Sequence, residues 1–203
     1  MGGGMQRDLP GRARAARLLI ALSAASMVAQ MLYEGAADLE VLGADYDAGA
    51  WSVLDAVSSL TVFLEGLGLA FWSSAFFERV QKAWPGSSER LPSPHAMAWI
   101  VFLFPITLFF PWLYLRRAAG IVGAGRAARL VSWYYGGAVA LSALGGLLAV
   151  FDPYDVMPEA SAWWLGYTVL LWGVSIAVTV LALPLIGRAT ERAMEGDVGE
   201  VFA

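Results

Sequence analysis

Five long runs of mainly apolar residues divide this chain, and they constrain its fold more than any other feature. The runs are Leu18–Tyr33, Ala56–Phe77, Ala96–Leu115, Leu130–Phe151 and Ala160–Gly187, and Glu65 is the single charged residue inside them. A helix that crosses a bilayer needs about 20 such residues. The composition agrees, because 59% of the residues are hydrophobic and only 15% are charged, against about 25% charged in an average globular chain. The pattern predicts an all-α integral membrane protein.

The boundaries of the runs predict a single helical membrane domain over residues 12–195. Within it we expect helices at about 17–41, 52–80, 129–151 and 160–187, and a fifth helical segment at 96–115. Residues 1–11 are expected to be disordered, and residues 196–203 are expected to form a C-terminal tail. The first run follows four arginines, as in a signal peptide, but no cleavage box and soluble domain come after it. We therefore interpret it as a retained anchor.

The segment Ala96–Leu115 contains Pro105 and Pro111 and no charge. Each proline removes a backbone donor and clashes with the preceding helical turn. If all five runs cross the bilayer, the 13 Lys and Arg residues divide seven to six between its two sides. If this segment turns back instead, all 13 lie on one side, as expected for cytoplasmic loops and termini. The sequence thus predicts four transmembrane helices plus a re-entrant or interfacial segment, with a five-helix bundle as the alternative.

The order of these features resembles a bacterial membrane family of uncharacterised role, domain of unknown function 4328. The matching residues are Trp99, Phe104-Pro105-Ile106 and Pro111, then Trp133, and finally Arg188 and Arg192. The resemblance covers about residues 12–195. It implies an arginine-rich start, a segment with two prolines and a last helix that ends in arginines, but no chemistry, since the family has no established activity.

Glu65 is the sharpest candidate for a functional residue, because it lies near the middle of the second run. A charged residue at the centre of a bilayer costs about 2.5–3.5 kcal/mol on insertion scales, so we expect this carboxyl group to be neutral or paired. Gly66 and Gly68 would let another helix or the segment with Pro105 and Pro111 approach it closely. One interpretation is a proton or cation site. The other, which we favour, is a structural hydrogen bond.

Arg116, Arg117, Arg126 and Arg129 form the strongest basic cluster. They are candidate contacts for anionic lipid headgroups, and they also fit a role in setting topology. The stretch Gly123–Ala128 matches the G-x-G-x-x-A nucleotide fingerprint. It lacks the preceding strand that this fingerprint requires, so we interpret it as a connecting loop.

These observations favour a non-enzymatic protein of the bacterial plasma (inner) membrane, with both termini cytoplasmic. We expect a scaffold or a helical bundle that binds lipid, other membrane proteins or a second copy of itself. The alternative is a small transporter or channel that uses Glu65 and the proline-broken segment. We expect no metal, no cofactor and no nucleic-acid partner. The chain has no cysteine and one histidine, and no nucleophile–base pair is evident, so an enzyme is not expected.

Overall fold

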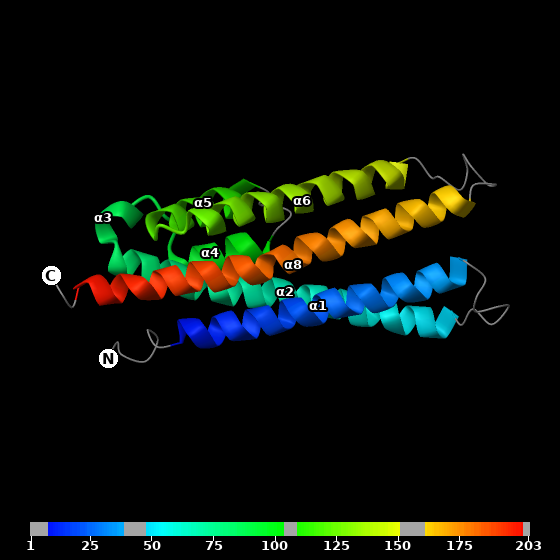
Figure 1. Cartoon of the computed structure of the whole chain (residues 1–203), viewed down its shortest axis with the longest axis horizontal. Helices are drawn as coiled ribbons and strands as arrows, with labels where there is room; N and C mark the ends of the chain where they lie inside the picture. Colours follow the sequence, from blue (N-terminus) through cyan, green and yellow to red (C-terminus); the bar gives the residue numbers. More distant parts are fainter. Residues whose placement is uncertain (1–7, 39–47, 104–108, 151–160, 201–203) are drawn as a thin grey trace.

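The computed structural model describes residues 8–38, 48–103, 109–150 and 161–200, and all secondary structure within them is helical. Four long helices form the body of the molecule: α1 (Leu9–Asp38), α2 (Ala48–Ala83), α6 (Gly125–Val150) and α8 (Ser161–Glu200). They run side by side along the long axis (Figure 1). Helix α1 packs against α2 and α8, and α6 packs against α8. The prediction of an all-helical protein is confirmed for these residues.

Three short helices lie together at one end of this bundle: α3 (Pro85–Ser88), α4 (Pro94–Phe102) and α5 (Phe109–Ile121). The start of α1, the end of α2, the start of α6 and the end of α8 lie at the same end (Figure 1). We call it the arginine end, after the side chains described below. The opposite end, where α1 ends and α2 begins, is called the α1–α2 end.

Local sequence signals explain where the short helices start and stop. Ser93 begins α4 as its N-cap, with its hydroxyl accepting a hydrogen bond from the Ala96 amide at 3.3 Å, and Pro94 occupies the first helical position. Helix α5 ends in a Schellman motif. Gly123 adopts a left-handed φ of 69°, while the Ala124 amide donates to the Ala119 carbonyl at 2.9 Å. Helix α6 begins immediately afterwards, so α5 folds back against it.

The largest buried side chains are concentrated towards the arginine end, where the short helices add to the long ones. Trp72 and Phe76 of α2 stack with 5.3 Å between ring centroids, and both are fully buried with Met97 of α4 and Leu185 of α8. The Trp72 indole N–H donates to the Thr190 hydroxyl at 3.0 Å. This core fixes α4 and α8 against α2.

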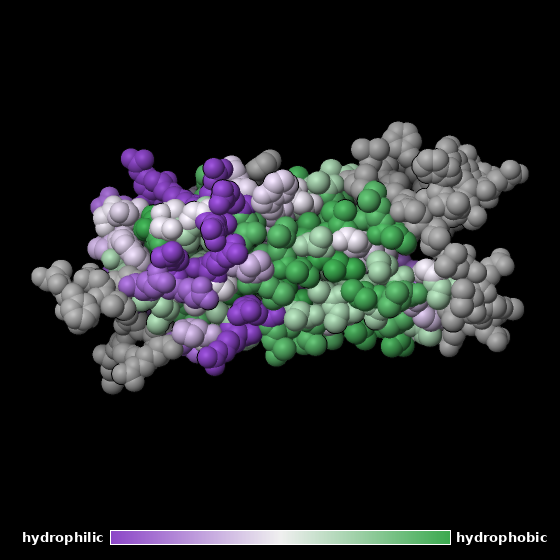
Figure 2. All heavy atoms as spheres, viewed as in Figure 1, coloured by the Kyte–Doolittle hydropathy of each residue, from purple (hydrophilic) through white to green (hydrophobic). Residues whose placement is uncertain are grey.

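Three helices are long and apolar enough to cross a membrane: Leu9–Ala36, Gly49–Ala83 and Val169–Glu195, among the residues that the structure describes. Their outer faces carry large exposed hydrophobic side chains, including Leu18, Phe71 and Leu170. Figure 2 shows a broad hydrophobic band over the middle of the bundle and hydrophilic residues gathered at the arginine end. Such a band would be unstable in water, so this is a membrane protein.

The helix bounds differ from the expected ones at several points. Helix α1 begins at Leu9, inside the stretch expected to be disordered, where Asp8 and Arg12 form an ion pair of 3.2 Å one turn apart. Helix α8 continues for 40 residues through Pro184 to Glu200, past the expected end at 187 and into the expected tail. The segment expected at 96–115 is divided between α4 and α5, and α5 continues to Ile121.

Candidate functional site

Polar side chains line two pockets in the described part of the chain: a cavity beside Glu65 and a groove at the arginine end. Glu65 of α2 is only 6% exposed. The hydroxyl of Tyr134, from α6, donates a hydrogen bond to its Oε1 atom at 3.4 Å. Among the described residues no lysine or arginine forms an ion pair with Glu65. The carboxyl group is therefore held by neutral partners.

A cavity of about 350 Å³ adjoins the Glu65 carboxyl group, and five helices line it. Its polar side chains are Glu65, Tyr134, Tyr135, Ser175 and Thr179, and its apolar ones include Met27 of α1 and Val101 and Phe102 of α4. Water occupies about 30 Å³ per molecule in the liquid, so the cavity has room for several waters or a small ligand. The site is a carboxyl group beside an open space, surrounded by apolar helices.

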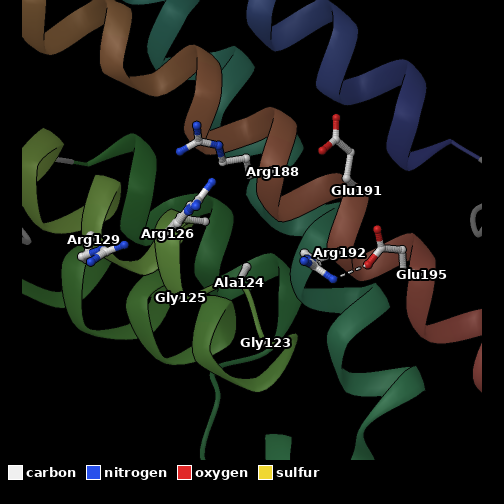
Figure 3. Close-up of a pocket in the computed structure, with 10 residues that line it drawn as sticks. Gly123, Ala124, Gly125, Arg126, Arg129, Arg188, Glu191, Arg192 and Glu195 are labelled. Atoms are coloured by element: carbon white, nitrogen blue, oxygen red, sulfur yellow. Dashed lines mark hydrogen bonds and ion pairs between the residues drawn. The ribbon is translucent and has the colours of Figure 1, made fainter.

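The groove at the arginine end lies between the first turn of α6 and the last turns of α8 (Figure 3). Its volume is about 790 Å³, and its charged side chains are Arg126 and Arg129 from α6 and Arg188, Glu191, Arg192 and Glu195 from α8. We call these four arginines and their surroundings the arginine groove. Figure 3 shows the Arg126 and Arg188 side chains directed into the space between the two helices.

The arginine groove carries an excess of positive charge, because four arginines and two glutamates line it. Arg192 pairs with Glu195 at 2.7 Å, whereas Arg126, Arg129 and Arg188 form no ion pair with any other described residue. The backbone of residues 123–125 also lines the groove. The first backbone N–H groups of a helix have no intrahelical acceptor and carry a partial positive charge. The arrangement favours an anion with several oxygen atoms, such as a phosphate.

The structure separates residues that the sequence placed in one cluster. Arg126 and Arg129 line the groove, but Arg116 and Arg117 lie on α5 and do not. The Arg116 guanidinium instead lies over the Trp112 ring, 5.4 Å from its centroid. This cation–π contact holds the Arg116 guanidinium against α5.

The glycines and prolines predicted to lie around Glu65 do not all line its cavity. Gly66 lines the cavity, and a Cβ atom there would meet nothing within 4 Å. At Gly68 a Cβ would lie 3.2 Å from the Ala16 Cα atom of α1, so this glycine does permit close helix packing. Pro111 is fully buried in the first turns of α5, and Pro105 lies outside the described residues.

Sequence reasoning did not place Tyr134, Arg188 or Arg192 in a site. For the two arginines a signal was present, since the predicted topology puts the segments around 126 and 188 on the same membrane face. For Tyr134 none was evident, because its contact with Glu65 spans 69 residues and depends on how α6 is rotated.

No family model, curated protein or solved structure matches this chain. The resemblance to the uncharacterised bacterial membrane family thus rests on the sequence features alone and stays a prediction. What the protein does has to be argued from the cavity and the arginine groove.

Proposed function

We propose that the chain is a four-crossing protein of the bacterial inner membrane with both termini in the cytoplasm. Helices α1, α2, α6 and α8 are the crossings. At 1.5 Å per residue the 26 residues of α6 span about 39 Å, enough for a hydrocarbon core of about 30 Å. Helix α4, with nine residues, spans only about 14 Å, and α5, with 13, about 20 Å. In this proposal α4 and α5 enter and leave on the cytoplasmic side.

The function proposed for this protein is non-enzymatic binding of anionic lipid through the arginine groove. One observation carries it: two pairs of arginines, about 60 residues apart in the sequence, line the same groove. A guanidinium group binds phosphate oxygens in a bidentate manner, and a basic residue near an anionic membrane surface contributes about 1 kcal/mol. The groove belongs to the arginine end, where hydrophilic residues gather beside the hydrophobic band (Figure 2). Lipid headgroups would lie at this level of a membrane.

Retention of phosphatidylglycerol tests this proposal, measured by native mass spectrometry of the protein purified in mild detergent. The double variant Arg126→Gln/Arg188→Gln should bind this lipid roughly 30-fold more weakly, because it removes two contacts of about 1 kcal/mol each. The matched control Arg116→Gln/Arg117→Gln removes the same charge from α5, outside the groove, and should retain lipid like the wild type. Equal losses in both variants would contradict a specific site.

The cavity beside Glu65 favours a second candidate, a small transporter or channel. A buried carboxyl group next to an open space can bind a proton or a cation during transport. Loss of ion flux in Glu65→Gln proteoliposomes, with lipid retention unchanged, would select this candidate over the first.

A further inference from the structure

A column of polar side chains connects Glu65 with the α1–α2 end of the bundle. Three of its members come from α1 and three from α2: Ser23, Ser26 and Gln30, and Asp55, Thr61 and Glu65. Ser23, Ser26 and Gln30 follow one another at spacings of three and four residues, which places them on one face of α1, and Thr61 and Glu65 are four residues apart on α2. Helices α1 and α2 are antiparallel neighbours (Figure 1), and two hydrogen bonds join the sets across the interface, from Gln30 to Asp55 and between Ser26 and Thr61. We call this set the polar column.

Contacts along the polar column run from the α1–α2 end inwards. The Gln30 side-chain amide donates to Glu34 at 3.1 Å and to Asp55 at 3.5 Å. Next, the hydroxyls of Ser26 and Thr61 share a hydrogen bond of 2.6 Å. The Ser26 hydroxyl also donates to the Ser23 backbone carbonyl at 2.8 Å, and the Ser23 side chain is a near neighbour of the Glu65 carboxyl group. Glu65 lies ten residues along α2 from Asp55, about 15 Å.

Two buried atoms of the column have hydrogen-bonding capacity to spare. The Ser23 hydroxyl is fully buried and the Gln30 side chain is 4% exposed, yet Ser23 Oγ and Gln30 Oε1 have no partner among the described residues. A hydroxyl both donates and accepts, so it can pass a proton to or from a water molecule. Buried polar groups of this kind are usually satisfied by water.

The column stops at Glu65. On the side towards the arginine end, Gly68 packs directly against Ala16 and Leu19 of α1, and the next α2 residue on this face, Trp72, is buried against Phe76. Such close apolar packing leaves no space for water. Polar side chains thus lie between Glu65 and the α1–α2 end, whereas apolar packing at Gly68 and Trp72 lies between Glu65 and the arginine end.

We infer that Glu65 is a proton-binding site that exchanges with the aqueous phase at the α1–α2 end through the polar column. The proton passes from water near Asp55 and Glu34 to the hydrogen-bonded hydroxyls of Thr61 and Ser26, then through intervening water to the Ser23 hydroxyl and a Glu65 carboxylate oxygen, and returns by the same route. The groups that face Glu65 are Ser23 from α1, Val101 and Phe102 from α4, Tyr134 and Tyr135 from α6 and Thr179 from α8. None of these is a carboxylate or a base, so Glu65 gains or loses its proton without a charged partner in the described structure.

Time-resolved infrared spectroscopy of oriented proteoliposomes tests the inference, with impermeant buffers on both sides. The C=O stretch of a protonated carboxyl group that is missing in Glu65→Gln identifies the signal of Glu65. Its intensity should follow a pH jump applied at the α1–α2 face and should not follow one at the arginine face. Thr61→Val should slow the response about tenfold, by interrupting the relay of hydroxyls.

Ser73→Ala is the matched control, because Ser73 is also a fully buried α2 serine, bonded to the Ala70 carbonyl at 2.9 Å and outside the column. Its exchange rate should equal that of the wild type. Three results would overturn the inference: a Glu65 signal that follows the pH at the arginine face, one that never titrates, or a Thr61→Val rate equal to that of the control. Lipid retention at the arginine groove is measured separately, so either proposal can fail without the other.

Discussion

Neighbouring glycines beside Glu65 have different physical roles. Gly66 faces the cavity, whereas Gly68 lies where α1 and α2 touch, with the Ala16 backbone 3.2 Å from the position of its missing Cβ. Small residues at helix interfaces let backbones approach closely in a membrane. The two positions are only two residues apart. Comparing the same substitution at both therefore measures how much the close approach of α1 and α2 contributes to stability.

Gly68→Ala should destabilise the protein by about 1 kcal/mol or more relative to Gly66→Ala, because the new methyl group overpacks the interface with Ala16. Thermal unfolding in detergent, followed by circular dichroism, measures the difference. Equal unfolding midpoints for the two variants would mean that α1 and α2 are not in close contact at Gly68.

At the scale of elements, two buried hydrogen bonds from α2 side chains reach the last turns of α8. The Trp72 indole and the Thr190 hydroxyl are both buried, 3.0 Å apart. Nearby, the Arg79 guanidinium donates from Nε to the Ala193 carbonyl at 3.2 Å. These contacts hold the end of α8, which carries Arg188 and Arg192, in place beside α6.

Thr190→Val should lower stability by about 1–3 kcal/mol, since it leaves the buried Trp72 N–H without an acceptor. Thr190→Ser keeps the hydroxyl and should lower the stability much less. The same variants report on the arginine groove, because lipid retention should decrease with Thr190→Val and persist with Thr190→Ser. If serine and valine unfold at the same temperature, the hydrogen bond contributes nothing.

The sequence predicted the positions of the helices better than it predicted which residues of different helices contact one another. Apolar runs indicate helices because each must satisfy its own backbone in lipid, and Pro94 and Gly123 mark a helix start and a helix end through their backbone preferences alone. The rotation of each helix about its axis depends on tertiary packing. That is why the contact of Tyr134 with Glu65 was not predicted, and why Arg116 was grouped with Arg126. The charged residues from Arg188 to Glu195 predict a short solvated helix, but residues 196–200 were expected to form a tail, and α8 includes them.

At the scale of the whole molecule, the polar column lies within the part of the bundle that the hydrophobic band covers (Figure 2), and the arginine groove lies at one end of the bundle. The groove lies between the start of α6 and the end of α8, at one end of the bundle, and the polar column extends from Glu65 towards the other end. Both the lipid-binding proposal and the proton-exchange proposal therefore depend on which face of the membrane each end of the bundle occupies. They require α4 and α5 to begin and end at the same face, so that α3 and the connection between α5 and α6 are both cytoplasmic.

Single-cysteine labelling tests this directly, because the chain has no cysteine of its own. Ser87→Cys in α3, Gly120→Cys near the end of α5 and Glu191→Cys in α8 each place a thiol at an exposed position. An impermeant maleimide should reach none of them in intact cells and all three in inverted membrane vesicles. Labelling of Gly120→Cys and Glu191→Cys in intact cells, with Ser87→Cys protected, would mean five crossings and would contradict the account.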